Sequence, residues 1–251
     1  MIQTSDIERP PREWVEALRL IGAATASSTL NRMGIRNSHI CGPIARTAAR
    51  AIAGPALTLQ FMPKREDLYG EDEYAEPEKQ LHRHVLYHTQ PGDIVVVDAR
   101  GDMRSGVFGD MMLTYFKGRG GIGVVVDGCL RDYPNTKQLD LALWISGLTP
   151  NFHTQTDLMP FGVNIPIACG GVLVMPGDVI VADDDGAVVV PVKLARELIE
   201  QASVQHGWEP FSKARLLEGG DLRRYYPLSD AARPEYEEWL EARSKDAPER
   251  N

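Results

Sequence analysis

Two short valine-rich runs, with one helix-length segment between them, constrain the fold of this chain more than any other feature. The first run lies in DIVVVDARGD, where Ile94–Val97 predict a buried strand, and the second lies in GIGVVVDG. Residues 109–118, between the two runs, predict a helix. Because the order strand, helix, strand joins parallel strands, the sequence predicts an α/β fold built on a parallel unit.

The remaining patterns extend this unit without dividing the chain. Apolar residues at helical spacing predict one helix over residues 11–33. Residues 161–191 predict short strands with PGD and DDDG turns, which would form a small antiparallel or barrel-like region. A charged helix is predicted near the C-terminus. We find no long linker, so we expect a single domain over residues 1–251, with an α/β core to about residue 205 and a C-terminal helical arm over about 206–251.

Charge and cysteine content exclude several classes of function. The formal net charge is −8 and the 27 basic residues are scattered, which argues against nucleic acid as a partner, because phosphate binding needs clustered Lys and Arg. The three cysteines are far apart and form no CxxC pair, so neither a structural zinc site nor a disulfide framework is expected. The polar N-terminus and the lack of a long apolar run predict no secretion signal and no membrane association. We therefore expect a cytoplasmic protein.

Polar groups gather where the two predicted strands end. Asp110 begins the predicted helix, and Arg131 and Asp132 follow the second strand, with twenty residues between Asp110 and Arg131. Because parallel strands end at the same edge of a sheet, these groups are expected to converge there, beside the backbone N–H groups of Met111 and Met112. Carboxylates without a His pair favour Mg²⁺ or Mn²⁺, and a neighbouring Arg suits a developing enolate. The pattern fits cleavage of a 2-oxo acid, although a simple helix cap and a surface ion pair stay open.

At this point the sequence resembles a known family. The segment FGDMMLTYFKGRGGIGVVVDGCLRD, supported by GPALTL, PGDIVVVDARGD and GGVLVMPGDVIVADDDGAVVVP, is similar to the class II pyruvate aldolases. That family includes the 4-hydroxy-4-methyl-2-oxoglutarate/4-carboxy-4-hydroxy-2-oxoadipate aldolases and the proteins named after regulator of ribonuclease activity A. The resemblance runs from about residue 20 to about residue 220.

The resemblance implies a fold and a role for each group. The fold would be a swivelling β/β/α sandwich with a central mixed sheet. Asp132 would bind the divalent ion directly and Asp110 would hold it through water. Arg131 would contact the substrate carbonyl oxygen and stabilise the pyruvate enolate, and the N–H groups of Met111 and Met112 would bind the pyruvyl carboxylate.

The resemblance also implies homotrimers or homohexamers with sites between subunits. A further Glu would come from the C-terminal region of a neighbouring subunit; Glu209 is the best match here, with Glu218 second. The segment Met62–His88 looks longer than in the compact aldolases and could reshape the substrate pocket. Within it, His82 and His84 are not expected to share a metal ion, because side chains two positions apart diverge on a helix. They are predicted to lie on a solvated helix face instead.

The leading hypothesis is a metal-dependent lyase that cleaves a 4-hydroxy-2-oxo acid, or decarboxylates oxaloacetate, through a pyruvate enolate. One alternative is a non-catalytic, ribonuclease-regulator-like interaction protein. Another is a hydratase or isomerase of sugar-derived 2-oxo acids on the same scaffold. The sequence does not choose among the possible physiological substrates.

Overall fold

A computed structural model describes residues 4–69 and 76–246. Most of its strands follow the valine-rich and β-branched runs of the sequence. The strands are β1 (Ile44–Ala45), β2 (Ile52–Pro63), β3 (Ile94–Asp98), β4 (Gly123–Leu130), β5 (Ala142–Leu148), β6 (Leu158–Val163), β7 (Ile167–Cys169), β8 (Val172–Val174), β9 (Val179–Asp183) and β10 (Gly186–Val190).

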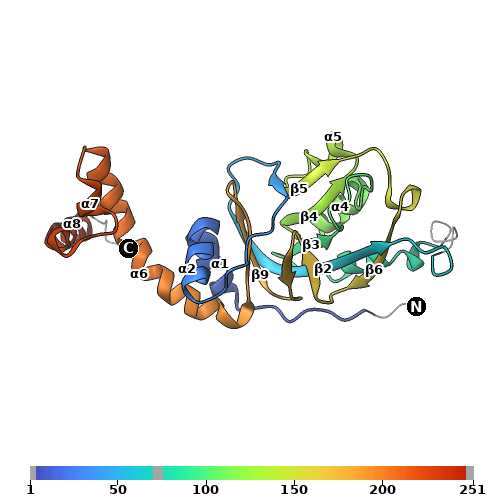
Figure 1. Cartoon of the computed structure of the whole chain (residues 1–251), viewed down its shortest axis with the longest axis horizontal. Coiled ribbons are helices and arrows are strands. Elements are labelled where there is room, and N and C mark those ends of the chain that lie inside the picture. The colour runs from blue at the N-terminus through green and yellow to red at the C-terminus, as the bar shows by residue number, and fades with distance from the viewer. Residues whose placement is uncertain (1–3, 70–75, 247–251) are drawn as a thin grey trace. The chain divides into compact units, whose positions relative to one another are not determined.

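The strands form a central mixed sheet and a separate hairpin (Figure 1). The sheet has the order β1-β5-β4-β3-β2-β9-β10, and β6 also pairs with β2. Strands β2, β3, β4 and β5 run parallel, which confirms the predicted parallel unit, while β1, β6, β9 and β10 are antiparallel to their neighbours. The strands predicted over residues 161–191 exist, but only β7 and β8 form a sheet of their own. The other three join the central sheet, because the long β2 offers an edge to both β6 and β9.

The prediction of a single helix over residues 11–33 was wrong, because two helices occupy this range. Gly22 separates them with φ at 77°, a conformation that favours glycine and interrupts the helix. The N–H of Ala23 donates to the carboxylate of Asp183 at 2.8 Å, so a residue far along the chain stabilises the new helix start. The helices are α1 (Arg12–Ile21), α2 (Ala23–Arg32), α3 (Leu81–Tyr87), α4 (Asp110–Gly118), α5 (Tyr133–Thr136), α6 (Ala195–Leu217), α7 (Leu222–Tyr225) and α8 (Arg233–Asp246).

Both faces of the central sheet are buried. In β3, Val95 and Val97 pack in a cluster with Phe116 of α4, whereas Val96 packs in a second cluster with Val172 of the β7–β8 hairpin. Successive side chains of a strand point to opposite faces, so a sheet covered on both sides reads as a continuous apolar run. Helices α3 and α4 therefore cover one face, and the hairpin covers the other.

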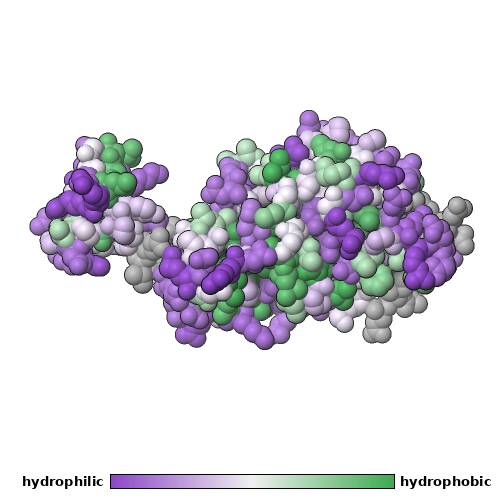
Figure 2. Space-filling view, in the orientation of Figure 1, coloured by the Kyte–Doolittle hydropathy of each residue, from purple (hydrophilic) through white to green (hydrophobic). Residues whose placement is uncertain are grey.

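The chain separates into two compact units, residues 1–199 and 200–251. The boundary lies inside α6, as does the boundary predicted between core and arm. The second unit packs around Phe211, whose ring contacts those of Tyr225, Tyr236 and Trp239. Hydrophobic atoms gather on its surface near α7 (Figure 2). Among the described residues, no helix has the length and apolar character needed to cross a membrane.

The buried carboxylate of Asp127, in β4, forms hydrogen bonds with two other segments of the chain. Asp127 accepts a hydrogen bond from the N–H of Ala99, after β3, and another at 2.9 Å from the N–H of Gly170, in the hairpin turn. Burial raises the pKa of Asp127 to about 6, because its backbone N–H donors offset only part of the lost solvation and the nearby charge of Asp98 adds to the rise.

Asp127 is expected to make this fold more stable at mildly acidic pH than at neutral pH. Its folded pKa of about 6 lies above the unfolded value of 3.8, so the folded state binds more protons over that interval and stability falls as pH rises. Between pH 4.5 and 7 the loss should be about 2 kcal/mol. Urea unfolding of the wild type and Asp127→Asn at both pH values would measure it. A difference between the two proteins that stays constant with pH would contradict the prediction.

Candidate active site

The C-terminal edge of the central sheet brings together the groups predicted from the twenty-residue spacing. The segment before α4 runs beside the end of β4, with the N–H of Val107 donating to the carbonyl of Cys129 at 3.0 Å. The N–H of Arg131 donates in turn to the carbonyl of Phe108 at 3.1 Å. These bonds hold the start of α4 next to the residues that follow β4. Asp110, Arg131 and Asp132 therefore lie at one rim, as the strand–helix–strand order predicts.

Asp110, the first residue of α4, is held on both carboxylate oxygens. Its Oδ1 accepts from the N–H of Met111 at 2.8 Å, and its Oδ2 accepts from Nδ2 of Asn135 at 2.9 Å. The expectation that both N–H groups after Asp110 are available to an anion therefore needs correction, because the N–H of Met111 is engaged by the neighbouring carboxylate. No hydrogen bond within the described residues uses the N–H of Met112. Asn135, on α5, is a contact that the sequence did not suggest.

Arg131 and Asp132 form a compact pair against the backbone of Gly109. Nε of Arg131 lies 3.2 Å from Oδ2 of Asp132. A Cβ atom at Gly109 would lie 2.5 Å from that oxygen and 3.0 Å from Nε of Arg131, so the absence of a side chain there is needed for the pair. Asp132 has φ at 56°, a left-handed conformation that is uncommon outside glycine and is often found at functional sites. Both side chains are about one-third exposed, at 32% and 38%.

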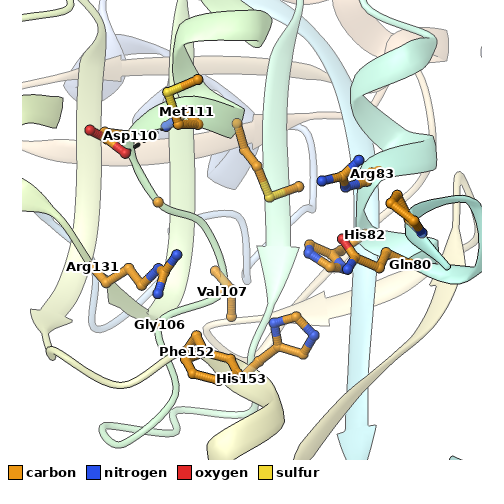
Figure 3. Close-up of a pocket in the computed structure, with 13 residues that line it drawn as sticks. Gln80, His82, Arg83, Gly106, Val107, Asp110, Met111, Arg131, Phe152 and His153 are labelled. Carbon is orange, nitrogen blue, oxygen red and sulfur yellow. Dashed lines mark hydrogen bonds between the residues drawn. The ribbon is translucent and has the colours of Figure 1, made fainter. Parts of the chain in front are cut away.

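A cavity of about 200 Å³ opens beside these groups (Figure 3). The volume is below the range typical of sites for drug-sized ligands and suits a small organic acid. Four of the predicted site residues line it, Asp110, Met111, Met112 and Arg131, but Asp132 does not. The lining residues are Pro77, Gln80, His82, Arg83, Gly106, Val107, Gly109, Asp110, Met111, Met112, Arg131, Phe152 and His153.

The far wall of this cavity comes from residues that the sequence did not predict to be functional. His82 and His153 are both buried, at 3% exposed, and their ring centroids lie 4.3 Å apart. The prediction of a solvated His82 and His84 was wrong, because His82 packs near Phe61 and Phe108, while Nε2 of His84 donates to the carbonyl of Glu78 at 2.9 Å. The two side chains do diverge, as expected for positions two apart. Four of the lining residues, Pro77, Gln80, His82 and Arg83, come from the segment Met62–His88.

The acid predicted from the C-terminal region lies in the second compact unit. Glu209 lines a groove there with Leu216 and Leu222, and Glu218 forms an ion pair with Arg215 at 3.1 Å. Residues 4–69 and 76–246 of a single chain contain no group of three or more His, Cys, Asp or Glu side chains able to hold a metal ion. The donors at the rim are two carboxylates, which fits Mg²⁺ or Mn²⁺, since Mg²⁺ commonly keeps several waters and uses only one or two protein carboxylates. They do not fit a closed zinc or calcium cage.

The chain is similar to proteins of known family. The protein-family model named RraA-like, described as Aldolase/RraA, matches residues 22–189 of the sequence. A Halalkalibacterium halodurans protein provisionally named 4-hydroxy-4-methyl-2-oxoglutarate aldolase is 38% identical over 47% of this chain and 55% of its own length. An Ectopseudomonas mendocina protein with the same provisional name is 35% identical over 41% of this chain and 63% of its own length. The chain thus spans less than two thirds of either relative.

A solved structure is similar over more of the chain. Streptomyces coelicolor RraAS2, described as an unusual member of the RNase ES inhibitor RraA protein family, is 45% identical, with a TM-score of 0.74. The similarity covers 82% of this chain and 98% of that one. These comparisons confirm the resemblance drawn from the Asp110 to Asp132 segment and its flanking strands. The chain belongs to the RraA-like aldolase family.

Proposed function

We propose that this chain is a divalent-metal-dependent lyase that cleaves a 4-hydroxy-2-oxo acid by retro-aldol reaction, decarboxylates oxaloacetate, or does both, through a pyruvate enolate. One observation supports the proposal above all: the Arg131–Asp132 pair packs against Gly109 beside a small cavity. The N-terminal residues of α4 line the same cavity. The provisional aldolase names of two relatives support it.

Asp132 would hold Mg²⁺ or Mn²⁺ directly, and Asp110 would hold it through water. When bound, the ion would draw electron density from the 2-oxo group of the substrate and so favour the enolate. Asn135 keeps Asp110 in one orientation by donating to its Oδ2. Glu209 of a neighbouring subunit is proposed as a further acid at this site, within a homotrimer or homohexamer. We also propose that the layered sheet, helices and hairpin form the swivelling β/β/α sandwich implied by the family.

Arg131 would act on the oxygen whose charge grows during the reaction. Its guanidinium points toward the cavity (Figure 3) and can donate to the 2-oxo oxygen of the substrate. As the C3–C4 bond breaks, its electron pair forms the enolate and the oxygen becomes negative, so the interaction strengthens toward the transition state. In a 4-hydroxy-2-oxo acid the 4-hydroxyl gives up its proton to a base and C4 leaves as a carbonyl compound, whereas in oxaloacetate C4 leaves as CO2. The N–H of Met112, near the positive end of α4, would bind the substrate carboxylate. Protonation of C3 then yields pyruvate.

Purified protein is expected to release pyruvate from 4-hydroxy-2-oxoglutarate or oxaloacetate when Mg²⁺ or Mn²⁺ is present. Excess EDTA should reduce the rate to that of the free substrate, and added Mn²⁺ should restore it, because the carboxylates require a cation to polarise the substrate. Pyruvate can be followed with lactate dehydrogenase and NADH, with an enzyme-free control for spontaneous decarboxylation. Turnover that is unchanged by EDTA would contradict the proposal.

A second candidate function rests on the 45% identity to Streptomyces coelicolor RraAS2. We propose as an alternative that the chain binds a ribonuclease of the RNase ES type without catalysing a reaction. Such binding would not need the Arg131–Asp132 pair. Titration of the purified chain into an RNase ES cleavage assay distinguishes the two: inhibition that survives Asp132→Asn, without pyruvate release, would support the alternative.

A further inference from the structure

The wall of the cavity that faces Arg131 carries a second guanidinium. Arg83 extends from α3, and Figure 3 shows its guanidinium and that of Arg131 on opposite sides of the cavity. Helix α3 is fixed in place because Val85 and Leu86 are buried in the core. The position of Arg83 is therefore set by the fold rather than by a surface loop.

Arg83 lacks a protein partner among the described residues. It is half-buried, it forms no ion pair there, and its Nε is fully buried without a hydrogen-bond partner. A guanidinium carries five N–H donors and remains charged at all physiological pH values. Because Nε is enclosed by the protein, a bound anion would contact the terminal Nη atoms, which form no hydrogen bond within the described residues, and would offset part of the free-energy cost of burying the charge.

The groups beside Arg83 are suited to the same ligand. His82 and His153 line the cavity, and burial, followed by the neighbouring His153, lowers the pKa of His82 well below its usual range. A neutral imidazole offers one N–H donor and adds no negative charge. Among the described residues that line the cavity, Asp110 is the only one with a carboxylate, and both of its oxygens are engaged, by Met111 and Asn135. The described part of the far wall thus combines a cation with two imidazoles and carries no carboxylate.

We infer that Arg83, together with His82 and His153, forms a second anion subsite that receives the distal carboxylate of the substrate. The inference rests on the proposed function, which places the 2-oxo acid end of the substrate at Arg131 and the start of α4. A substrate with a carboxylate at each end would then bridge the two guanidiniums. Arg83 acts as a specificity-determining residue, selecting dicarboxylates over 2-oxo acids of the same length that end in a methyl group.

Size and charge both favour this assignment. A cavity of about 200 Å³ has room for a short dicarboxylate and little more. A site built to bind a charged group discriminates strongly against an analogue that lacks it, because the buried donors are left unpaired. A ligand that ends in a methyl group would leave the Arg83 guanidinium without an acceptor among the described residues, whereas a carboxylate would supply one to its terminal nitrogens.

Binding of two non-cleavable ligands tests the subsite. In the presence of Mn²⁺, the wild type is expected to bind 2-oxoglutarate at least about 30-fold more tightly than 2-oxopentanoate in isothermal titration calorimetry. Arg83→Met should remove most of this preference by weakening 2-oxoglutarate alone, and Arg83→Lys should keep part of it. Arg65→Met, in the same segment but exposed and paired with Asp67, is the matched control and should leave both affinities unchanged. Thermal unfolding verifies that each variant is folded.

Kinetics on matched substrates separate this inference from the proposed function. The wild type should cleave 4-hydroxy-2-oxoglutarate in preference to 4-hydroxy-2-oxopentanoate, and Arg83→Met should lower kcat/KM about 30-fold for the first substrate only. If neither substrate is cleaved but 2-oxoglutarate binds through Arg83, the proposed reaction fails and the subsite stands. Equal affinity of the wild type for the two ligands, or an equal loss for both in Arg83→Met, would overturn the subsite.

Discussion

Replacing Asp132 by Asn is expected to lower metal-dependent pyruvate release by about 10³-fold. The substitution keeps the size of the side chain but removes the negative charge that a hard cation requires. Polarisation of a carbonyl by a bound cation is worth several kcal/mol, which corresponds to a factor of this order in rate. The lactate dehydrogenase assay measures kcat/KM, and Mn²⁺ binding, followed by its electron paramagnetic resonance signal, should weaken in parallel.

A matched variant separates this effect from a general loss of surface charge. Asp157 is 70% exposed and forms an ion pair with Arg104 at 2.7 Å, so Asp157→Asn removes one carboxylate away from the cavity and should leave activity unchanged. Full activity of Asp132→Asn would exclude Asp132 as a metal ligand. Loss of activity with intact Mn²⁺ binding would instead make Asp132 a positioning residue that orients Arg131 through their 3.2 Å contact.

The near side of the site could be predicted because it depends on local patterns. The apolar runs of β3 and β4 specify two buried strands, and the residues between them have the length of one helix and its loops. Parallel strands must end at one edge, so Asp110 and Arg131 are brought together by connectivity alone. What the sequence did not show is that the N–H of Met111 is used by Asp110 itself. That detail depends on a side-chain rotamer, which spacing does not determine.

The far side of the site could not be predicted because its residues meet only in the folded chain. His82 lies in a helix of seven residues, too short for periodicity to show which face is buried. Its charged and polar neighbours suggested solvent, but contacts with Phe61, Phe108 and the distant His153 place it in the interior. The helix break at Gly22 has the same origin, since the carboxylate of Asp183 that receives the N–H of Ala23 is remote in sequence. Long-range contacts of this kind override local propensity.

Replacing Arg131 by Met is expected to lower kcat for pyruvate release by about 10²- to 10³-fold, with a smaller change in KM. The guanidinium lies 3.2 Å from Asp132 through Nε and 5.6 Å from the centre of the Phe152 ring, so its position is set before substrate binds. A preorganised donor stabilises the enolate oxygen more than the ground-state carbonyl, and its loss therefore falls mainly on kcat. Steady-state kinetics on oxaloacetate and 4-hydroxy-2-oxoglutarate would measure both constants.

Two further variants test whether Arg131 acts through its charge alone. Arg131→Lys keeps the cation but loses the planar fork that contacts Asp132 and is proposed to reach the substrate as well, so it should recover only a small part of the lost rate. Arg104→Met removes an exposed arginine whose partner is Asp157, and it should behave like the wild type. If Arg131→Met raised KM with kcat unchanged, the guanidinium would bind the ground state and the transition state equally. Its role would then be to hold the substrate carboxylate, and stabilisation of the enolate would have to come from the metal site.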